Sequence, residues 1–100
     1  MDYIVGQRWV SHADAQLGLG VVVEVDGRRV TLSFPAVGEE RTYAADTAPL
    51  TRLRFKQGDH VSTVNGVELL VSEVLEQNGL IVYRGTDHHD AELSVSELEL

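Results

Sequence analysis

Four consecutive polar residues near the end of the chain form its densest group of potential metal ligands. The segment Asp87-His88-His89-Asp90 offers two imidazoles and two carboxylates, groups that suit zinc or nickel. Neighbouring residues of an extended chain point to opposite sides, so His88 and His89 converge on one ion only in a tightly folded loop. We interpret the segment as a solvated loop between strands and predict no metal site. His12 and His60 are isolated and predict no site either.

Two glycines before an apolar run have the first spacing of a dinucleotide-binding loop. Gly18 and Gly20 are not followed by the third glycine of that motif, and the run after them has the pattern of a strand rather than a helix. We interpret them as positions where the chain bends into a long strand. The sequence also lacks the G-x-x-x-x-G-K-[ST] loop that holds nucleotide phosphates. We therefore expect no cofactor and no catalytic residue in this chain.

An aromatic cage for a methylated lysine or arginine requires several ring faces around one cation. The chain has six aromatic residues. Phe34 shares strand parity with Val30 and Leu32 and is expected in a core, and Trp9 and Tyr43 supply one wall at most. The sequence therefore does not predict a cage.

The net charge of −8 is divided unequally along the chain. Residues 1–54 carry six arginines against seven acidic residues, a net charge of −1. Residues 55–100 carry one lysine and one arginine against nine acidic residues, a net charge of −7. Because nucleic-acid affinity comes largely from neutralising phosphates, the second half should not bind nucleic acid, and the first half should bind it weakly at most. The acidic half either serves solubility or is an electrostatic partner for a basic surface.

Arginine and aromatic side chains are enriched at protein interfaces, and exposed acids attract basic partners. On this basis the candidate partner contacts are Arg8, Trp9, Arg28, Arg29, Arg41, Tyr43 and Arg52 in the first half, and Glu92, Glu97 and Glu99 in the second. The arginines could equally contact phosphate, or pair with nearby acids such as Asp26, Glu39 and Glu40.

The local pattern is one of short β-rich runs separated by turn dipeptides. Asp26-Gly27, Asn65-Gly66 and Asn78-Gly79 each favour a hairpin turn. Before the first turn, Val21, Val23 and Val25 alternate with Val22, Glu24 and Asp26, and after it Val30, Leu32 and Phe34 alternate with polar residues. This alternation predicts strands with one buried and one solvated face.

Other runs predict a bent strand, very little helix and a repeat. The long run Val67–Glu76 should bend or bulge. The helical content should stay below about 10% and be confined to one turn within Ser11–Leu17 that Ser11 caps.

The segments that begin at Gly6 and Gly58 each open a similar series of strands. We predict an all-β chain of two tandem small, strongly bent antiparallel sheets or barrels, residues 1–54 and 55–100.

Targeting signals are not evident. No apolar run approaches the roughly 20 residues of a membrane-spanning helix, and the first residues do not resemble a signal peptide. The absence of cysteine fits a reducing compartment. We therefore expect no membrane partner.

An ordered set of motifs runs along almost the whole chain. Its members are Gly6-Gln7-Arg8-Trp9, Leu17-Gly18-Leu19-Gly20-Val21, Val25-Asp26, Val30-Thr31-Leu32, Phe34-Pro35, Gly38-Glu39, Arg41, Tyr43-Ala44 and Thr51-Arg52, then more sparsely Gly58-Asp59, Asn78-Gly79-Leu80, Tyr83 and Gly85-Thr86. Together they resemble the N-terminal region of the RapA family, also called HepA, of bacterial RNA polymerase-associated Swi/Snf-type ATPases.

The resemblance implies two tandem Tudor-like, SH3-like folds at the start of a large cytoplasmic helicase-like ATPase, whose motor lies outside this fragment. It further implies a non-catalytic regulatory module that contacts RNA polymerase core and the parent's own ATPase domains, and restrains the ATPase during polymerase recycling. The alternative is a weak nucleic-acid-binding module that acts through the arginines of residues 1–54.

Overall fold

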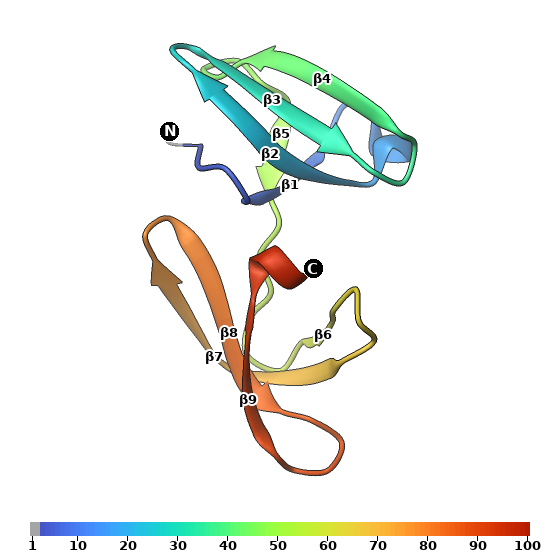
Figure 1. Cartoon of the computed structure of the whole chain (residues 1–100), viewed down its shortest axis with the longest axis vertical. Helices are drawn as coiled ribbons and strands as arrows, with labels where there is room; N and C mark the ends of the chain where they lie inside the picture. Colours follow the sequence, from blue (N-terminus) through green and yellow to red (C-terminus); the bar gives the residue numbers. More distant parts are fainter. Residues whose placement is uncertain (1–2) are drawn as a thin grey trace. The chain divides into compact units, whose positions relative to one another are not determined.

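The computed structural model describes residues 3–100, and the chain divides into two units, Met1–Leu53 and Arg54–Leu100 (Figure 1). Each unit is an antiparallel sheet around its own apolar core. Helix in the described residues is limited to two 3-10 turns of three residues each, η1 (Ala15–Leu17) and η2 (Glu97–Glu99). None of the described helices is long and apolar enough to span a membrane. The predicted all-β fold class is confirmed.

Within residues 3–53, five strands form one sheet in the order β4-β3-β2-β1-β5. The strands are β1 (Arg8–Ser11), β2 (Leu19–Asp26), β3 (Arg29–Phe34), β4 (Glu39–Ala44) and β5 (Leu50–Arg52). The predicted alternation of β3 is confirmed, because Val30, Leu32 and Phe34 are all fully buried. They form the core with Tyr3, Trp9, Leu17, Val22 and Leu50.

The strand β2 buries the face opposite to the one that its valine alternation favoured. Val22 is 0% exposed, whereas Val23 and Val25 are 41% and 43% exposed. The register with β3 shifts between Val22 and Glu24, so one extra residue interrupts the alternation at this point. The turn is also offset by one position, since Asp26 pairs with Arg29 and the loop is Gly27-Arg28.

Gly18, directly before β2, and Gly20, within β2, are required for different structural reasons. Gly18 has a φ of 72°, a conformation that other residues rarely adopt, and this is the predicted bend into the strand. Gly20 instead allows close packing, because a Cβ there would lie 2.7 Å from Cε1 of Phe34 and 2.9 Å from Cδ2 of Leu32.

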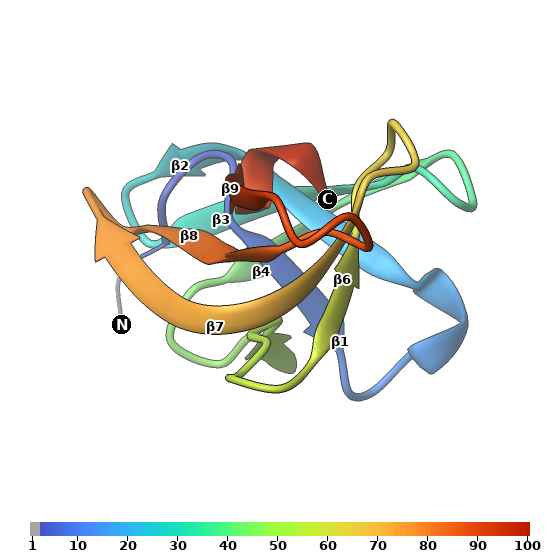
Figure 2. The ribbon, with the colours of Figure 1, turned by 90° about the horizontal axis from the view of Figure 1, so that it is seen from below.

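Residues 54–100 form a sheet in the order β6-β7-β8-β9. The strands are β6 (His60–Ser62), β7 (Glu68–Gln77), β8 (Leu80–Thr86) and β9 (Glu92–Ser96), around a core of Val61, Leu69, Val71, Ile81, Tyr83 and Val95. Figure 2 shows that β7 curves strongly along its length, and its register with β8 shifts between Val71 and Glu73. The predicted bend of this long strand is confirmed. Asn78 and Gly79 both have positive φ in the β7–β8 turn, as their sequence predicts.

The repeat that begins at Gly6 and Gly58 has a counterpart in the backbone of each unit. In the first unit the Gly6 N–H donates to the Val22 carbonyl at 2.9 Å, and the Val22 N–H donates to the Gln7 carbonyl at 3.0 Å. In the second unit the Gly58 N–H donates to the Val71 carbonyl at 2.8 Å, and the Val71 N–H donates to the Asp59 carbonyl at 2.9 Å. Each valine directly precedes its bulge, so both units follow one plan.

Candidate functional site

Two of the predicted contact residues lie inside the first unit. Arg8 and Trp9 of β1 are only 7% and 5% exposed. The Arg8 guanidinium donates to the Gly6 carbonyl at 2.6 Å, and the Trp9 indole N–H donates to Gln7 Oε1 at 3.0 Å. The Trp9 ring also packs against Tyr3 at 4.6 Å between centroids. A direct partner contact does not fit these positions, because both side chains are occupied by local structure.

Arg52 and Tyr43 are both half-buried in the first unit. Arg52 pairs with Trp9 across β5 and β1, and its guanidinium lies 5.7 Å from the Trp9 ring centroid, within the range of a cation–π interaction. Tyr43 of β4 is half-buried and packs against the first core. Its hydroxyl is buried and has no hydrogen-bond partner among the described residues. A face of the Trp9 ring is therefore covered by Arg52 of the same unit.

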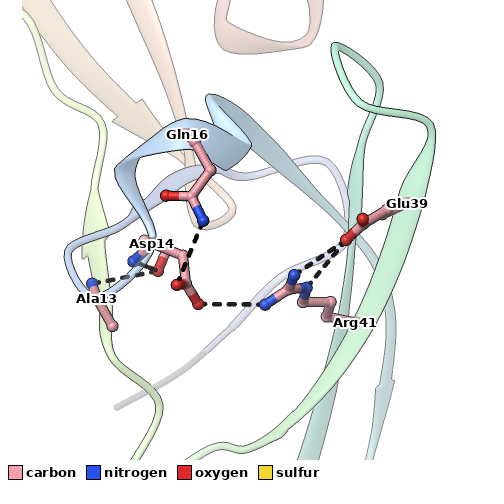
Figure 3. A network of polar contacts seen from close by, with 6 residues as sticks. Ala13, Asp14, Gln16, Glu39 and Arg41 are labelled. Carbon is pink, nitrogen blue, oxygen red and sulfur yellow. Dashed lines mark hydrogen bonds and ion pairs between the residues drawn. The ribbon is translucent and has the colours of Figure 1, made fainter.

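Arg41 belongs to an ion-pair network that joins β4 to the loop around η1 (Figure 3). Its guanidinium lies 3.2 Å from Asp14 Oδ2 and 3.1 Å from Glu39 Oε2. The hydrogen bonds that Arg41 donates to the Glu39 carboxylate raise the pKa of Arg41 above its ordinary value. Ser11 Oγ accepts the Asp14 N–H at 3.0 Å in the same loop, but the N-cap of η1 is Asp14, so the prediction that Ser11 caps this turn is wrong. The positive charge of Arg41 is therefore already paired within the unit.

Arg28 and Arg29 lie at the exposed tip of the β2–β3 hairpin. No ion pair is found for either side chain within residues 3–100. They are consequently the arginines of the first unit that are best placed to contact an external anion or acid.

The three predicted acidic contacts differ sharply in accessibility. Glu92 is exposed at the start of β9. Glu99 is exposed, but its carboxylate accepts the Ser96 N–H at 2.8 Å and completes a capping box around η2. Glu97 is 0% exposed, and its carboxylate accepts the backbone N–H of Ile81. The prediction that Glu97 contacts a partner does not fit this burial, because its side chain faces the core.

The Asp87-His88-His89-Asp90 segment folds into the predicted loop, between β8 and β9. Asp87 Oδ1 accepts the N–H of His89 at 2.8 Å and that of Ala91 at 3.0 Å. The bonds from Ala91 and then His89 lower the pKa of Asp87 below its ordinary value. The His88 and His89 rings lie 3.9 Å apart. No group of three or more metal-ligating side chains is assembled among residues 3–100.

Sequence reasoning missed a surface of the second unit that contains exposed aliphatic side chains. Leu70 and Val67 are 43% and 41% exposed, beside hollows lined by Glu68, Asp87 and His88. The signal was present in the sequence, because Leu69-Leu70-Val71 places an apolar residue where strand alternation calls for a polar one.

Both halves of the chain match known family models. Residues 3–53 match the model described as RapA N-terminal Tudor like domain 1, and residues 55–100 match the model described as RapA N-terminal Tudor like domain. The boundary between the two matches falls where the structure divides into its two units.

Curated relatives show the same likeness. The chain is 48% identical over all 100 residues to RNA polymerase-associated protein RapA of Yersinia enterocolitica, and 47% identical over 100 residues to that of Serratia proteamaculans. It is 51% identical to the Cronobacter sakazakii protein over 86 residues, or 86% of this chain. The chain spans only 9–10% of the length of these relatives.

Proposed function

The chain belongs to the RapA family of RNA polymerase-associated proteins, and we propose that it is a non-catalytic module through which a longer parent protein contacts RNA polymerase core. The observation that carries this proposal is the match of two successive Tudor-like domain models to nearly the whole chain. Such small bent sheets offer exposed loops and faces on rigid scaffolds, which suits binding rather than chemistry. The name of the relatives, RNA polymerase-associated protein RapA, supports RNA polymerase as the proposed partner and a cytoplasmic location.

The same module is proposed to restrain the ATPase domains that the family resemblance assigns to the parent. Residues 55–100 carry a net charge of −7, and most of the contributing acids are exposed. A motor that follows phosphate backbones needs a basic channel, and an acidic surface would be attracted to it. Attraction of this kind is screened over roughly 8–10 Å at ordinary ionic strength, so the restraint should weaken in salt.

The second candidate function is weak nucleic-acid binding by the first unit, and the exposed pair Arg28 and Arg29 favours it. Arg8 is buried, Arg41 is ion-paired and Arg52 packs over Trp9. Two adjacent arginines make few phosphate contacts, so affinity and its salt dependence should both be small.

A retention experiment tests the main proposal. The 100-residue chain is immobilised and exposed to purified bacterial RNA polymerase core, with and without nuclease, at low and physiological salt. We expect core enzyme to be retained and nuclease to have no effect. The variant R28A/R29A separates the candidates, since it should retain the polymerase while losing any binding to short RNA or DNA. Failure to retain core enzyme, with both units folded, would refute the proposal.

A further inference from the structure

The outer face of the second sheet carries an unusual row of side chains. Register places His60 of β6 opposite Leu70 of β7, and Leu70 opposite Thr86 of β8. Residues directly opposite in adjacent strands share one face of a sheet. The neighbouring residues Leu69 and Val71 point into the core and are 0% and 2% exposed, so this row points to solvent.

Leu70 is an exception on this solvated face. It is 43% exposed, and Val67, near the start of the same strand, is 41% exposed. The residue beside Leu70 on the same face, two positions back, is the polar and exposed Glu68. When a partner covers exposed aliphatic side chains, the free energy of the complex is lowered in proportion to the apolar area removed from water.

Two adjoining hollows surround these aliphatic side chains, and we call them together the Leu70 groove. Val67, Glu68 and Leu70 line the groove from β7 and the turn before it. Asp87, His88 and Asp90 line it from the β8–β9 loop. Glu68, Asp87 and Asp90 contribute three carboxylates, and no lysine or arginine lines either hollow among the described residues.

The carboxylates of the Leu70 groove are not neutralised by the second unit itself. Glu68 and Asp90 form no ion pair within residues 3–100, and the bonds that Asp87 accepts come from neutral backbone N–H groups. Those bonds hold Asp87 in its ionised form, since they lower its pKa. The groove is therefore apolar at its centre and negative at its rim, which is complementary to a cationic segment with an apolar side chain.

We propose that the Leu70 groove docks a protein segment in which an aliphatic or aromatic side chain is flanked by lysine or arginine. The apolar side chain covers Leu70 and Val67, and the flanking cations face Glu68 and Asp90. This inference rests on the proposed protein-contact function and specifies the chemistry that the partner presents. A nucleic-acid strand is disfavoured, because its phosphates would face three carboxylates.

The test uses the isotope-labelled 100-residue chain and, as the probe, a short peptide with one leucine between lysines. We expect the peptide to shift amide resonances mainly in residues 66–70 and 86–90. The variant L70S should weaken binding about fivefold through lost apolar contact. The variant E68Q/D90N should weaken it about threefold at low salt and less at high salt. Asparagine tolerates the positive φ of Asp90, so this variant keeps the loop.

Matched controls lie on the first unit. Val25 is 43% exposed, like Leu70, so V25S makes a similar surface change elsewhere. The exposed pair Glu24 and Asp26 allows E24Q/D26N, which removes the same charge as E68Q/D90N. Both controls should bind the peptide as the unmodified chain does.

Several outcomes would overturn the inference. Equal weakening of peptide binding by L70S and V25S would do so, as would peptide-induced resonance shifts outside the groove. Stronger shifts with a short RNA than with the peptide would point to nucleic acid, and self-association that L70S abolishes would point to a second copy of the chain. Retention of polymerase by the chain and equally by L70S would remove the groove and leave the proposed function intact. Peptide binding at the groove without polymerase retention would support the groove and refute the proposed function.

Discussion

Glu97 places a carboxylate inside the second unit, where water does not reach it. Its side chain accepts the N–H of Ile81, a residue that is itself fully buried at the start of β8. A buried N–H group without an acceptor costs about 1–3 kcal/mol. Glu97 therefore stabilises the junction between η2 and β8, and its role is structural.

Replacing Glu97 with alanine should lower the free energy of unfolding of the second unit by about 2–4 kcal/mol, because the Ile81 amide loses its acceptor and a cavity opens. Urea titration, followed by the resonances of residues 54–100, measures this change. The exposed Glu92 provides the control, and Glu92→Ala should leave the midpoint nearly unchanged. Similar midpoints for the two variants would show that the buried contact is not needed.

The burial of Glu97 could have been predicted, whereas that of Arg8 could not. Leu93, Val95 and Glu97 share parity, so extending the strand alternation by one step places Glu97 on the core side with the buried Val95. The contact of the Arg8 guanidinium with the Gly6 carbonyl depends on the conformation of a glycine with a φ of 98°. Residue type and spacing contain no information about such a contact.

At the level of elements, the bulge in β7 is fitted to a glycine on β8. A Cβ at Gly85 would lie 1.9 Å from the carbonyl oxygen of Leu70, so the two backbones approach as closely as they do only because Gly85 has no side chain. The same close approach places the Leu70 carbonyl against Gly85.

The variant Gly85→Ala should destabilise the second unit by about 3 kcal/mol or more, because a backbone rather than a flexible side chain must move. Thermal unfolding measured by circular dichroism reports the loss. Gly27 is the comparison, since its φ is 59° and nothing lies within 4 Å of an added Cβ. Gly27→Asn should be tolerated, because asparagine accepts this conformation.

The β8–β9 loop should loosen in acid, because it depends on an ionised Asp87. Its hydrogen bonds from Ala91 and His89 lower the pKa of Asp87 from its ordinary 3.8. The stabilisation is therefore complete above that ordinary value and is lost as the pH falls through the lower pKa of the folded state. The protection factors of the amides in residues 87–91, which take the pH dependence of the intrinsic exchange rate into account, should fall over this acidic range. In Asp87→Ala they should already be low above it. Equal protection factors in the two chains, unchanged across this range, would contradict the assignment.

Strands and turns were predictable where the determinants are local. The Asn78-Gly79 dipeptide determines its two-residue turn by conformational preference alone, and β3 shows its alternation directly. The face of β2 was not predictable, because the extra residue between Val22 and Glu24 is defined by the register with β3. Register is a property of a strand pair, and a single strand's sequence does not contain it.

At the scale of the whole molecule, the two units share one backbone plan but differ in net charge by four, from −2 in Met1–Leu53 to −6 in Arg54–Leu100. The first unit pairs or buries several of its arginines, and the second exposes many unpaired acids. The fold alone therefore does not assign roles to the units, and their surfaces must.

In the full-length parent, the variant E68Q/D90N/E92Q should raise basal ATPase activity at low salt, because it removes three exposed acids from the proposed restraint. The difference should shrink as salt increases. Glu97 is left unchanged because its carboxylate is buried on the Ile81 amide, and replacing it would destabilise the unit as well as remove a charge. The control E24Q/D26N/E40Q removes equal charge from the first unit and should have no effect. Equal rates for parent and variant at low salt would favour a purely steric restraint.

The Asn78-Gly79 turn makes the protein susceptible to deamidation during storage. In an asparagine followed by glycine, the next backbone nitrogen readily attacks the side-chain carbonyl carbon and ammonia leaves. Water then opens the resulting succinimide to aspartate or isoaspartate. Asn78 is exposed, and its turn joins Gln77 directly to Leu80. Isoaspartate adds one carbon to the backbone of a two-residue loop, which disturbs the pairing that the loop determines. Stored protein should therefore accumulate a more acidic form in which the pairing of β7 with β8 is disturbed next to this turn.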